Sequence, residues 1–199
     1  MALDMELVKK LREQTGISIL ECKKAIEEAK GDLTKASEIL RKKGFEKAKA
    51  KSSRVTNQGA VGSYIHMKGK IGVLVELGCE TDFVAKNEDF LQLIKDIAMQ
   101  IAALNPRYIS ENDIPAETLE KEKEIYYEQL KSSGKPANII EKIVEGKLSK
   151  FYAEACLLHQ NFFKDDKMTI EKLIAEKIHK TGENIIVKRF VRYQVGEES

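Results

Sequence analysis

Hydrophobic and polar positions alternate most strictly over residues 59–79, and this period of two predicts a pair of β-strands. Lys68 and Gly69 separate the two alternating runs, which indicates a β-hairpin with glycine in its turn. A third run, IIVKRFVRYQV at residues 185–195, is rich in β-branched and aromatic residues and predicts a long strand that joins the hairpin. Arg189 falls in phase with the apolar residues of this run, so we expect a bulge or an exposed end there.

Apolar residues at helical spacing predict helices over most of the remaining chain. Near the N-terminus they indicate three short helices within residues 4–43. Ser18 and Glu21 form a capping box for the second of these helices, and we expect Gly44 to end the third. Further helices are expected from Asn87 to Leu104, from Pro115 onward, from Pro136 to about His159, and from Thr169 to Gly182.

This order of elements predicts an α+β protein, in which a small three-helix bundle precedes a core of three antiparallel strands packed with helices. The expected boundaries are a helical module at 1–44, a basic linker at 45–56 and an α+β core domain at 57–199. A module of about 40 residues is close to the lower limit for independent folding. Such a module often leaves apolar side chains for a partner, and Ile19 and Leu20 are the candidates.

The charge of the chain argues against a general affinity for polyanions. Its 199 residues include 34 Lys and Arg against 32 Asp and Glu, so the formal net charge is only +2. Residues 41–54, RKKGFEKAKAKSSR, are the exception, with seven basic residues and one acidic. We interpret this stretch as a helical or flexible solvated linker, because few aromatic residues interleave with the charges. An arm that binds RNA or the ribosome is the alternative, since lysine and arginine neutralise phosphates whatever the sequence.

No pattern in the sequence predicts a catalytic, metal or cofactor site. Cys22, Cys79 and Cys156 are far apart and odd in number, which favours free thiols in a reducing compartment. Cys156 and His159 have the spacing of half a zinc site, but no second half follows. Without a glycine-rich phosphate loop or a nucleophile motif, we expect no enzymatic activity. The N-terminus lacks a signal-peptide pattern and no segment is apolar enough to span a membrane, so we expect a cytoplasmic protein.

The least ordinary stretch is ETDFVAKNEDF, residues 80–90, at the predicted junction between a strand and a helix. Such junctions normally use small polar residues, yet here Asp82 and Phe83 lie side by side. Large aromatic side chains are usually buried. The residues alone therefore favour Phe83 packed in its own core and Asp82 as a turn cap. The alternative is that the junction displays Phe83 for a partner.

Three segments, in order, resemble the bacterial translation elongation factor Ts family: TGISILECKKAIEEAKGD, CETDFVAKNEDF and TGENIIVKRFVRYQVGE. KPANIIEKIVEGKLSKFY is also similar to that family, and the resemblance covers nearly the whole chain. It implies a UBA-like N-terminal module and a guanine-nucleotide exchange factor that binds EF-Tu·GDP, displaces Mg²⁺ and promotes GDP release during translation elongation. The chain resembles the compact form with a single core copy, which leaves a homodimer or a 2:2 complex open.

The resemblance also assigns roles to particular residues. The element that reaches the partner's magnesium site matches Thr81, Asp82, Phe83 and Val84. The candidate docking residues of the N-terminal module are Leu11, Arg12, Ile19 and Leu20. Gln100, where many relatives have histidine, is a candidate secondary contact that would offer a neutral amide. The resemblance favours display of Phe83, while Asp82 either acts on the magnesium network or only orients Phe83. An adaptor that uses the N-terminal module alone is a further alternative.

Overall fold

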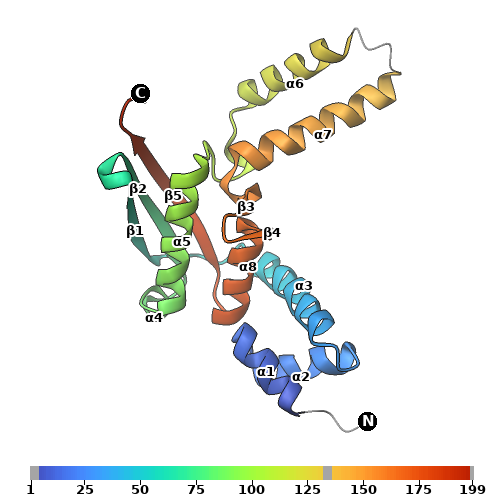
Figure 1. Cartoon of the computed structure of the whole chain (residues 1–199), viewed down its shortest axis with the longest axis vertical. Helices are drawn as coiled ribbons and strands as arrows, with labels where there is room; N and C mark the ends of the chain where they lie inside the picture. The colour runs from blue at the N-terminus through green and yellow to red at the C-terminus, as the bar shows by residue number, and fades with distance from the viewer. Residues whose placement is uncertain (1–4, 132–135, 198–199) are drawn as a thin grey trace. The chain divides into compact units, whose positions relative to one another are not determined.

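A computed structural model describes residues 5–131 and 136–197 and divides the chain into two compact units (Figure 1). The first unit comprises residues 1–63, 74–96 and 172–190, and the second comprises residues 64–73, 97–171 and 191–199. The domain boundaries expected from the sequence stay a prediction. None of the helices in the described ranges is long and apolar enough to cross a membrane.

Three helices at the N-terminus pack on one another around a small apolar core. They are α1 (Met5–Thr15), α2 (Ile19–Glu28) and α3 (Leu33–Lys51). The hydroxyl of Ser18 accepts the backbone N–H of Glu21 at 3.4 Å and so caps α2. The carboxylate of Asp32 caps α3 in the same way. Their shared core consists of Val8, Leu11, Ile17, Cys22, Ala25, Ile26, Ala29, Ala36 and Leu40. The prediction of three helices in this region is confirmed.

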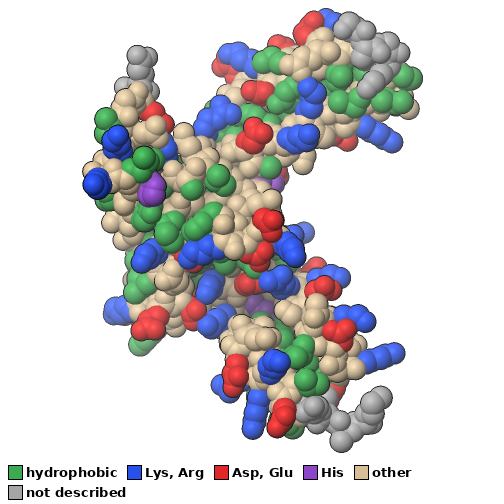
Figure 2. Space-filling model, in the orientation of Figure 1, with side chains coloured by type: hydrophobic (Ala, Val, Ile, Leu, Met, Phe, Trp, Pro, Cys, Tyr) green, Lys and Arg blue, Asp and Glu red, His purple; other side chains and the backbone are tan. Residues whose placement is uncertain are grey.

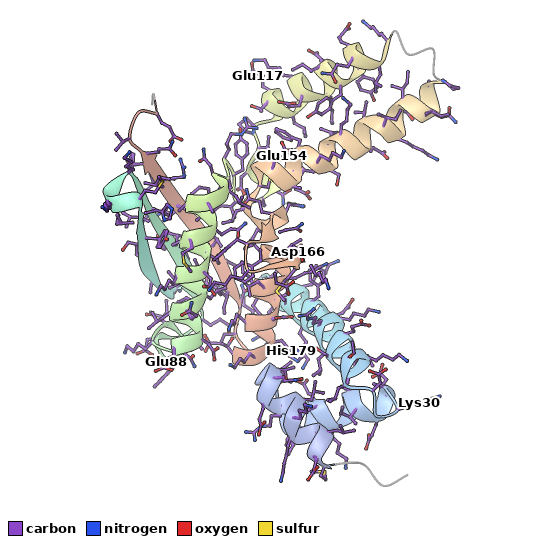
Figure 3. The ribbon with its side chains drawn as sticks, viewed as in Figure 1. Lys30, Glu88, Glu117, Glu154, Asp166 and His179 are labelled. Atoms are coloured by element: carbon purple, nitrogen blue, oxygen red, sulfur yellow. The ribbon has the colours of Figure 1, made fainter. Side chains whose placement is uncertain are left out.

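The prediction that Gly44 ends the third helix is wrong. Helix α3 continues through Gly44 to Lys51, so much of the basic stretch is helical. Gly44 is buried, and a Cβ atom placed on it would lie 3.1 Å from Nδ1 of His179 on α8 (Ile170–Thr181). His179 is labelled in Figure 3. The glycine therefore permits the close approach of two helices instead of ending one of them.

The main sheet has three antiparallel strands in the order β1-β2-β5. They span Gln58–His66, Ile71–Cys79 and Ile185–Gln194, and a 3₁₀ turn, η1 (Met67–Gly69), joins the first two. Gly69 has φ +93°, a backbone conformation that favours glycine. Arg189 on β5 is exposed and pairs with Glu76 on β2 at 2.7 Å. The predicted hairpin, third strand and α+β class are confirmed.

Two helices follow the hairpin: the one-turn helix α4 (Asp82–Ala85) and the long helix α5 (Glu88–Leu104). The side-chain oxygen of Asn87 accepts the backbone N–H of Asp89 at 2.8 Å, which caps α5 as the sequence predicts. The apolar face of α5 is buried and includes Phe90, Leu93, Ile94, Ile97, Ala98 and Ile101. The predicted helix from Asn87 to Leu104 is thus confirmed to within one residue.

The second unit contains an antiparallel pair of helices, α6 (Ala116–Lys131) and α7 (Ala137–Ala155), seen side by side in Figure 1. Helix α7 ends at Ala155 instead of near His159, because the backbone N–H of Leu157 bonds to the carbonyl of Tyr108 at 2.9 Å. Short 3₁₀ turns lie at Glu111–Asp113 (η2) and Leu157–His159 (η3). Strands β3 (Asn161–Phe162) and β4 (Asp165–Thr169) form a small antiparallel sheet that the sequence pattern did not predict.

Candidate functional site

The strand–helix corner, which we define as residues 79–87, connects β2 to α5 through helix α4. Thr81 is the N-cap of α4, and its hydroxyl accepts the backbone N–H of Val84 at 3.4 Å. The thiol of Cys79 is buried and donates to the carbonyl of Thr81 at 3.1 Å. Burial, together with the nearby carboxylate of Glu183, raises the pKa of this thiol, so it stays protonated as a donor at neutral pH. The turn is therefore capped by Thr81 and not by Asp82.

Phe83 projects from this corner into solvent. Its exposed fraction of 83% is larger than that of any other large hydrophobic side chain in the described part of the chain. Its neighbour Val84 is only 9% exposed and anchors the turn on the core. Glu88, labelled in Figure 3, marks the start of α5 just beyond the corner. The expectation from the residues alone, that Phe83 packs in its own core, is wrong.

Asp82 is an exposed carboxylate at the start of α4. Its Oδ2 atom accepts a hydrogen bond from Nζ of Lys86 at 2.8 Å, an i,i+4 pair across the turn. This hydrogen bond and the charge of Lys86 hold the pKa of Asp82 below its ordinary value of 3.8. Asp82 is therefore charged at neutral pH and stands next to the displayed aromatic ring.

Sequence reasoning missed the residue that fixes the base of the corner, Glu183. Its Oε2 atom accepts the backbone N–H groups of Glu80 and Thr81 at 3.2 and 3.0 Å. Its Oε1 atom accepts the hydroxyl of Thr81 at 2.6 Å. Glu183 lies about a hundred residues further along the chain, in the segment TGEN between α8 and β5. No local spacing could have paired these positions.

The N-terminal module displays three of its four candidate docking residues. Ile19 is 47% exposed and Leu20 is 59% exposed at the start of α2, and Arg12 is exposed on α1. Leu11 is fully buried in the core that α1–α3 share. The prediction of Leu11 as a docking residue is wrong, because its side chain stabilises the module and does not reach the surface.

Gln100 is also in the interior. It is fully buried on α5, and its amide nitrogen donates to Oε1 of Gln160 at 3.2 Å and to the carbonyl of Asn161 at 3.0 Å. Its amide oxygen accepts the backbone N–H of Phe163 at 3.0 Å. The prediction of Gln100 as a surface contact is wrong. The side chain satisfies buried polar groups next to the β3–β4 sheet, which is its structural role.

Helix α8 is tied to α2, α3 and α5 by ionic side chains. Nε2 of His179 lies 2.8 Å from Oε2 of Glu21, and Lys47 on α3 also pairs with Glu21. Burial acts to raise the pKa of Glu21, but the hydrogen bonds from Lys47 and His179 outweigh it, and the pKa is lowered. On α5, Asp89 pairs with Lys177 at 3.1 Å and with Lys180 at 2.6 Å. These pairs hold the helical elements around the corner together.

The cysteines and histidines form no metal centre within the described ranges. No group of three or more His, Cys, Asp or Glu side chains in residues 5–131 and 136–197 is placed to hold an ion. Cys22, Cys79 and Cys156 are free, as the sequence predicts, and the structure buries all three. Burial raises the pKa of the Cys156 thiol to about 11. Nε2 of His159, the other half of the C-x-x-H spacing, lies 3.3 Å from Oε2 of Glu111.

The sequence is similar to one family over almost its full length. The family model described as "Elongation factor TS" matches residues 5–197. A relative named "Elongation factor Ts" from Thermodesulfovibrio yellowstonii is 59% identical over 197 residues, covering 99% of this chain and 98% of the relative. Relatives of the same name from Thermosipho melanesiensis and Thermotoga neapolitana are 56% and 54% identical. These alignments cover 98% and 100% of this chain and 100% of both relatives. The chain therefore belongs to the elongation factor Ts family.

Proposed function

We propose that this protein is a guanine-nucleotide exchange factor for the GTPase EF-Tu. In this proposal it binds EF-Tu·GDP, displaces Mg²⁺ and promotes GDP release in translation elongation, in the cytoplasm, without covalent catalysis. The observation that carries the proposal is the display of Phe83, 83% exposed, on a capped corner of a family member. Large aromatic side chains are usually buried, and Phe83 is the most exposed large hydrophobic side chain in the described ranges.

Phe83 supplies the binding energy that opens the partner. Mg²⁺ demands near-ideal octahedral geometry, so small displacements of its ligands weaken its hold on the nucleotide. Burying one phenylalanine side chain is worth about 1.5–3 kcal/mol. If the gap that receives Phe83 exists only in the distorted, weakly binding state of EF-Tu, that energy favours the state that releases GDP.

Phe83 does not act alone in this proposal. A thousandfold acceleration of GDP release requires about 4 kcal/mol, which is more than one buried ring contributes. Ile19, Leu20 and Arg12, exposed on the N-terminal module, supply the additional docking surface. Asp82, charged next to Phe83, is placed to act on the magnesium network as well. Linkage then requires that GDP weaken the binding of this protein to the same degree, so that nucleotide rebinding releases it.

The structure offers little support for the alternative of an RNA-binding arm. Most cations of the basic stretch have partners in their own unit. Lys43 pairs with Glu28, Lys47 with Glu21, Arg41 with Glu176 and Arg54 with Glu80, and Lys51 donates to the carbonyl of Gly182. Figure 2 shows basic and acidic side chains interspersed over the helical module on the visible face. The acidic partners lower the net positive charge around this stretch, which weakens its attraction for a phosphate backbone.

Stopped-flow release of a fluorescent GDP analogue from EF-Tu, with and without this protein, tests the proposed function. We expect acceleration that saturates with protein concentration at millimolar Mg²⁺. A release rate that stays at the value of EF-Tu alone, with protein that is folded by circular dichroism, would refute the proposal. The RNA-binding alternative instead predicts RNA affinity that falls steeply with salt.

A further inference from the structure

The base of the strand–helix corner is fixed by a carboxylate from a distant part of the chain. One side chain, that of Glu183, accepts three hydrogen bonds: from the backbone N–H groups of Glu80 and Thr81 and from the Thr81 hydroxyl, at 3.2, 3.0 and 2.6 Å. Hydrogen bonds to a carboxylate are stronger than those between neutral groups. Glu183 is thus the strongest external restraint on the residue that precedes α4.

The restraint is reciprocal. Glu80, whose backbone is held by Glu183, accepts the backbone N–H of Asn184 on its own Oε1 atom at 2.6 Å. The side-chain amide of Asn184, which is 2% exposed, donates to the carbonyls of Ser52 and Arg54 at 3.4 and 2.9 Å. The end of β2, the start of β5 and the segment that follows α3 therefore meet in one hydrogen-bonded junction.

Helix α4 cannot fix the direction of Phe83 by itself. It has only four residues, and a single helical turn has little intrinsic stability. Phe83 is 83% exposed, so contacts of its own ring restrain it little. The hydroxyl of Thr81 links the two parts, since it donates to Glu183 and accepts the backbone N–H of Val84. The orientation of the turn, and of Phe83 on it, follows from how Thr81 is held.

We propose that Glu183 is a positioning residue for nucleotide exchange: its carboxylate fixes Thr81 and thereby holds Phe83 in the orientation that enters the partner. The inference rests on the proposed exchange function and deepens it. Pre-organisation of a binding group removes the ordering cost at the moment when it inserts. Glu183 acts through Phe83 and has no contact with the partner in this proposal.

The test compares Glu183→Ala with two other single variants in the release of fluorescent GDP from EF-Tu. Glu183→Gln keeps the shape but removes the charge. Its amide oxygen can still accept the backbone N–H groups, while its amide nitrogen must donate to the Thr81 hydroxyl instead of accepting from it, so neutral hydrogen bonds replace the charge-assisted ones. Glu76→Ala is the matched control, because Glu76 is a carboxylate on β2 that pairs with Arg189 on β5, outside the corner. All variants are first checked by circular dichroism.

We expect Glu183→Ala to lower the maximal release rate about tenfold, with little change in the half-saturating concentration. Glu183→Gln should lie between Glu183→Ala and the wild type, and Glu76→Ala should equal the wild type. If Glu183→Ala does not fold, Glu183→Gln tests the inference instead, and we expect it to lower the maximal release rate about threefold. A maximal rate equal to that of the wild type in the folded Glu183 variants would overturn the inference.

A double-mutant cycle separates positioning from a merely structural role. In a Phe83→Ala background, Glu183→Ala should have less than about a twofold further effect, because the group that it positions is gone. If Glu183→Ala lowers the maximal release rate about tenfold in that background as well, the inference is overturned, because Glu183 would then act independently of Phe83. A wild-type protein that does not accelerate release at all would instead refute the proposed function, before any variant is compared.

Discussion

Phe83 on α4 and Phe90 on α5 lie seven residues apart, and their environments are opposite. Phe83 is 83% exposed, whereas Phe90 on α5 is fully buried. The same type of side chain is thus exposed to solvent at position 83 and packed in the core at position 90. Replacing each phenylalanine by alanine therefore tests the proposed binding role of Phe83 separately from the stabilising role of Phe90.

Phe90→Ala should destabilise the protein by about 3–5 kcal/mol, because it removes a large buried side chain and leaves a cavity. Phe83→Ala should change the free energy of unfolding by less than about 0.5 kcal/mol, because exposed side chains contribute little. Urea unfolding followed by circular dichroism measures both. Equal destabilisation by the two substitutions would mean that Phe83 is packed in solution.

The proposed docking role of the N-terminal module predicts a change in affinity without a change in maximal rate. Leu20→Ala should raise the protein concentration at half-maximal GDP release by about tenfold, since it removes an apolar contact worth about 1.5 kcal/mol. Ile139→Ala on α7 is a matched control, because Ile139 is similarly exposed, at 44% against 59% for Leu20. If the half-saturating concentration rises equally for both variants, or does not change for either, the start of α2 is not a docking site.

Two glycines inside helices should respond oppositely to alanine. Gly146→Ala on α7 should stabilise the protein by about 0.5–1 kcal/mol, because a Cβ there meets nothing within 4 Å. Gly44→Ala should destabilise it by about 1–2 kcal/mol, because His179 lies 3.1 Å from the new Cβ and is held by Glu21. Thermal unfolding measures both changes. A higher melting temperature for Gly44→Ala would show that α3 and α8 do not pack as closely as described.

Asp89 should make the protein sensitive to acid. The hydrogen bond from Lys180, together with Lys177, holds its pKa below 3.8 in the folded state. A lowered folded pKa means that the stabilisation is present above the unfolded pKa and is lost as the pH falls through the folded value. At pH 7 Asp89→Asn should therefore lower the free energy of unfolding by about 1 kcal/mol.

The difference between Asp89→Asn and the wild type should shrink as the pH falls below 3.8. Urea unfolding at a series of pH values follows this trend. Asp166→Asn, which alters an exposed carboxylate on β4, is the control and should match the wild type throughout. A difference that stays constant with pH would show that the charge of Asp89 is not the cause.

Local patterns predicted most of the fold because the contacts involved are local. Alternation identified the hairpin before Cys79 and the final strand, and helical spacing with a capping residue identified α5 to within one residue. The prediction that Gly44 ends α3 is wrong because glycine occurs both at helix ends and where two helices approach closely. Only the position of His179, far along the chain, distinguishes the two uses.

The candidate site was less predictable because it depends on which face of an element is covered. Leu11 and Gln100 were predicted to contact the partner, yet both side chains are buried. Their burial depends on tertiary packing, which the local sequence does not specify. The residues alone favoured a buried Phe83, and only the family resemblance favoured its display. Glu183 could not be found from spacing, since its partner Thr81 lies 102 residues away.

Whether Phe83 opens the partner is measured by the maximal rate of GDP release from EF-Tu with saturating Phe83→Ala protein, compared with saturating wild type at millimolar Mg²⁺. We expect the folded variant to bind but to release GDP at least about tenfold more slowly, because the proposed insertion of the ring would contribute about 1.5–3 kcal/mol. The difference in maximal release rate between Phe83→Ala and the wild type should become smaller when EDTA removes Mg²⁺. A maximal rate equal to that of the wild type would show that Phe83 does not drive nucleotide release.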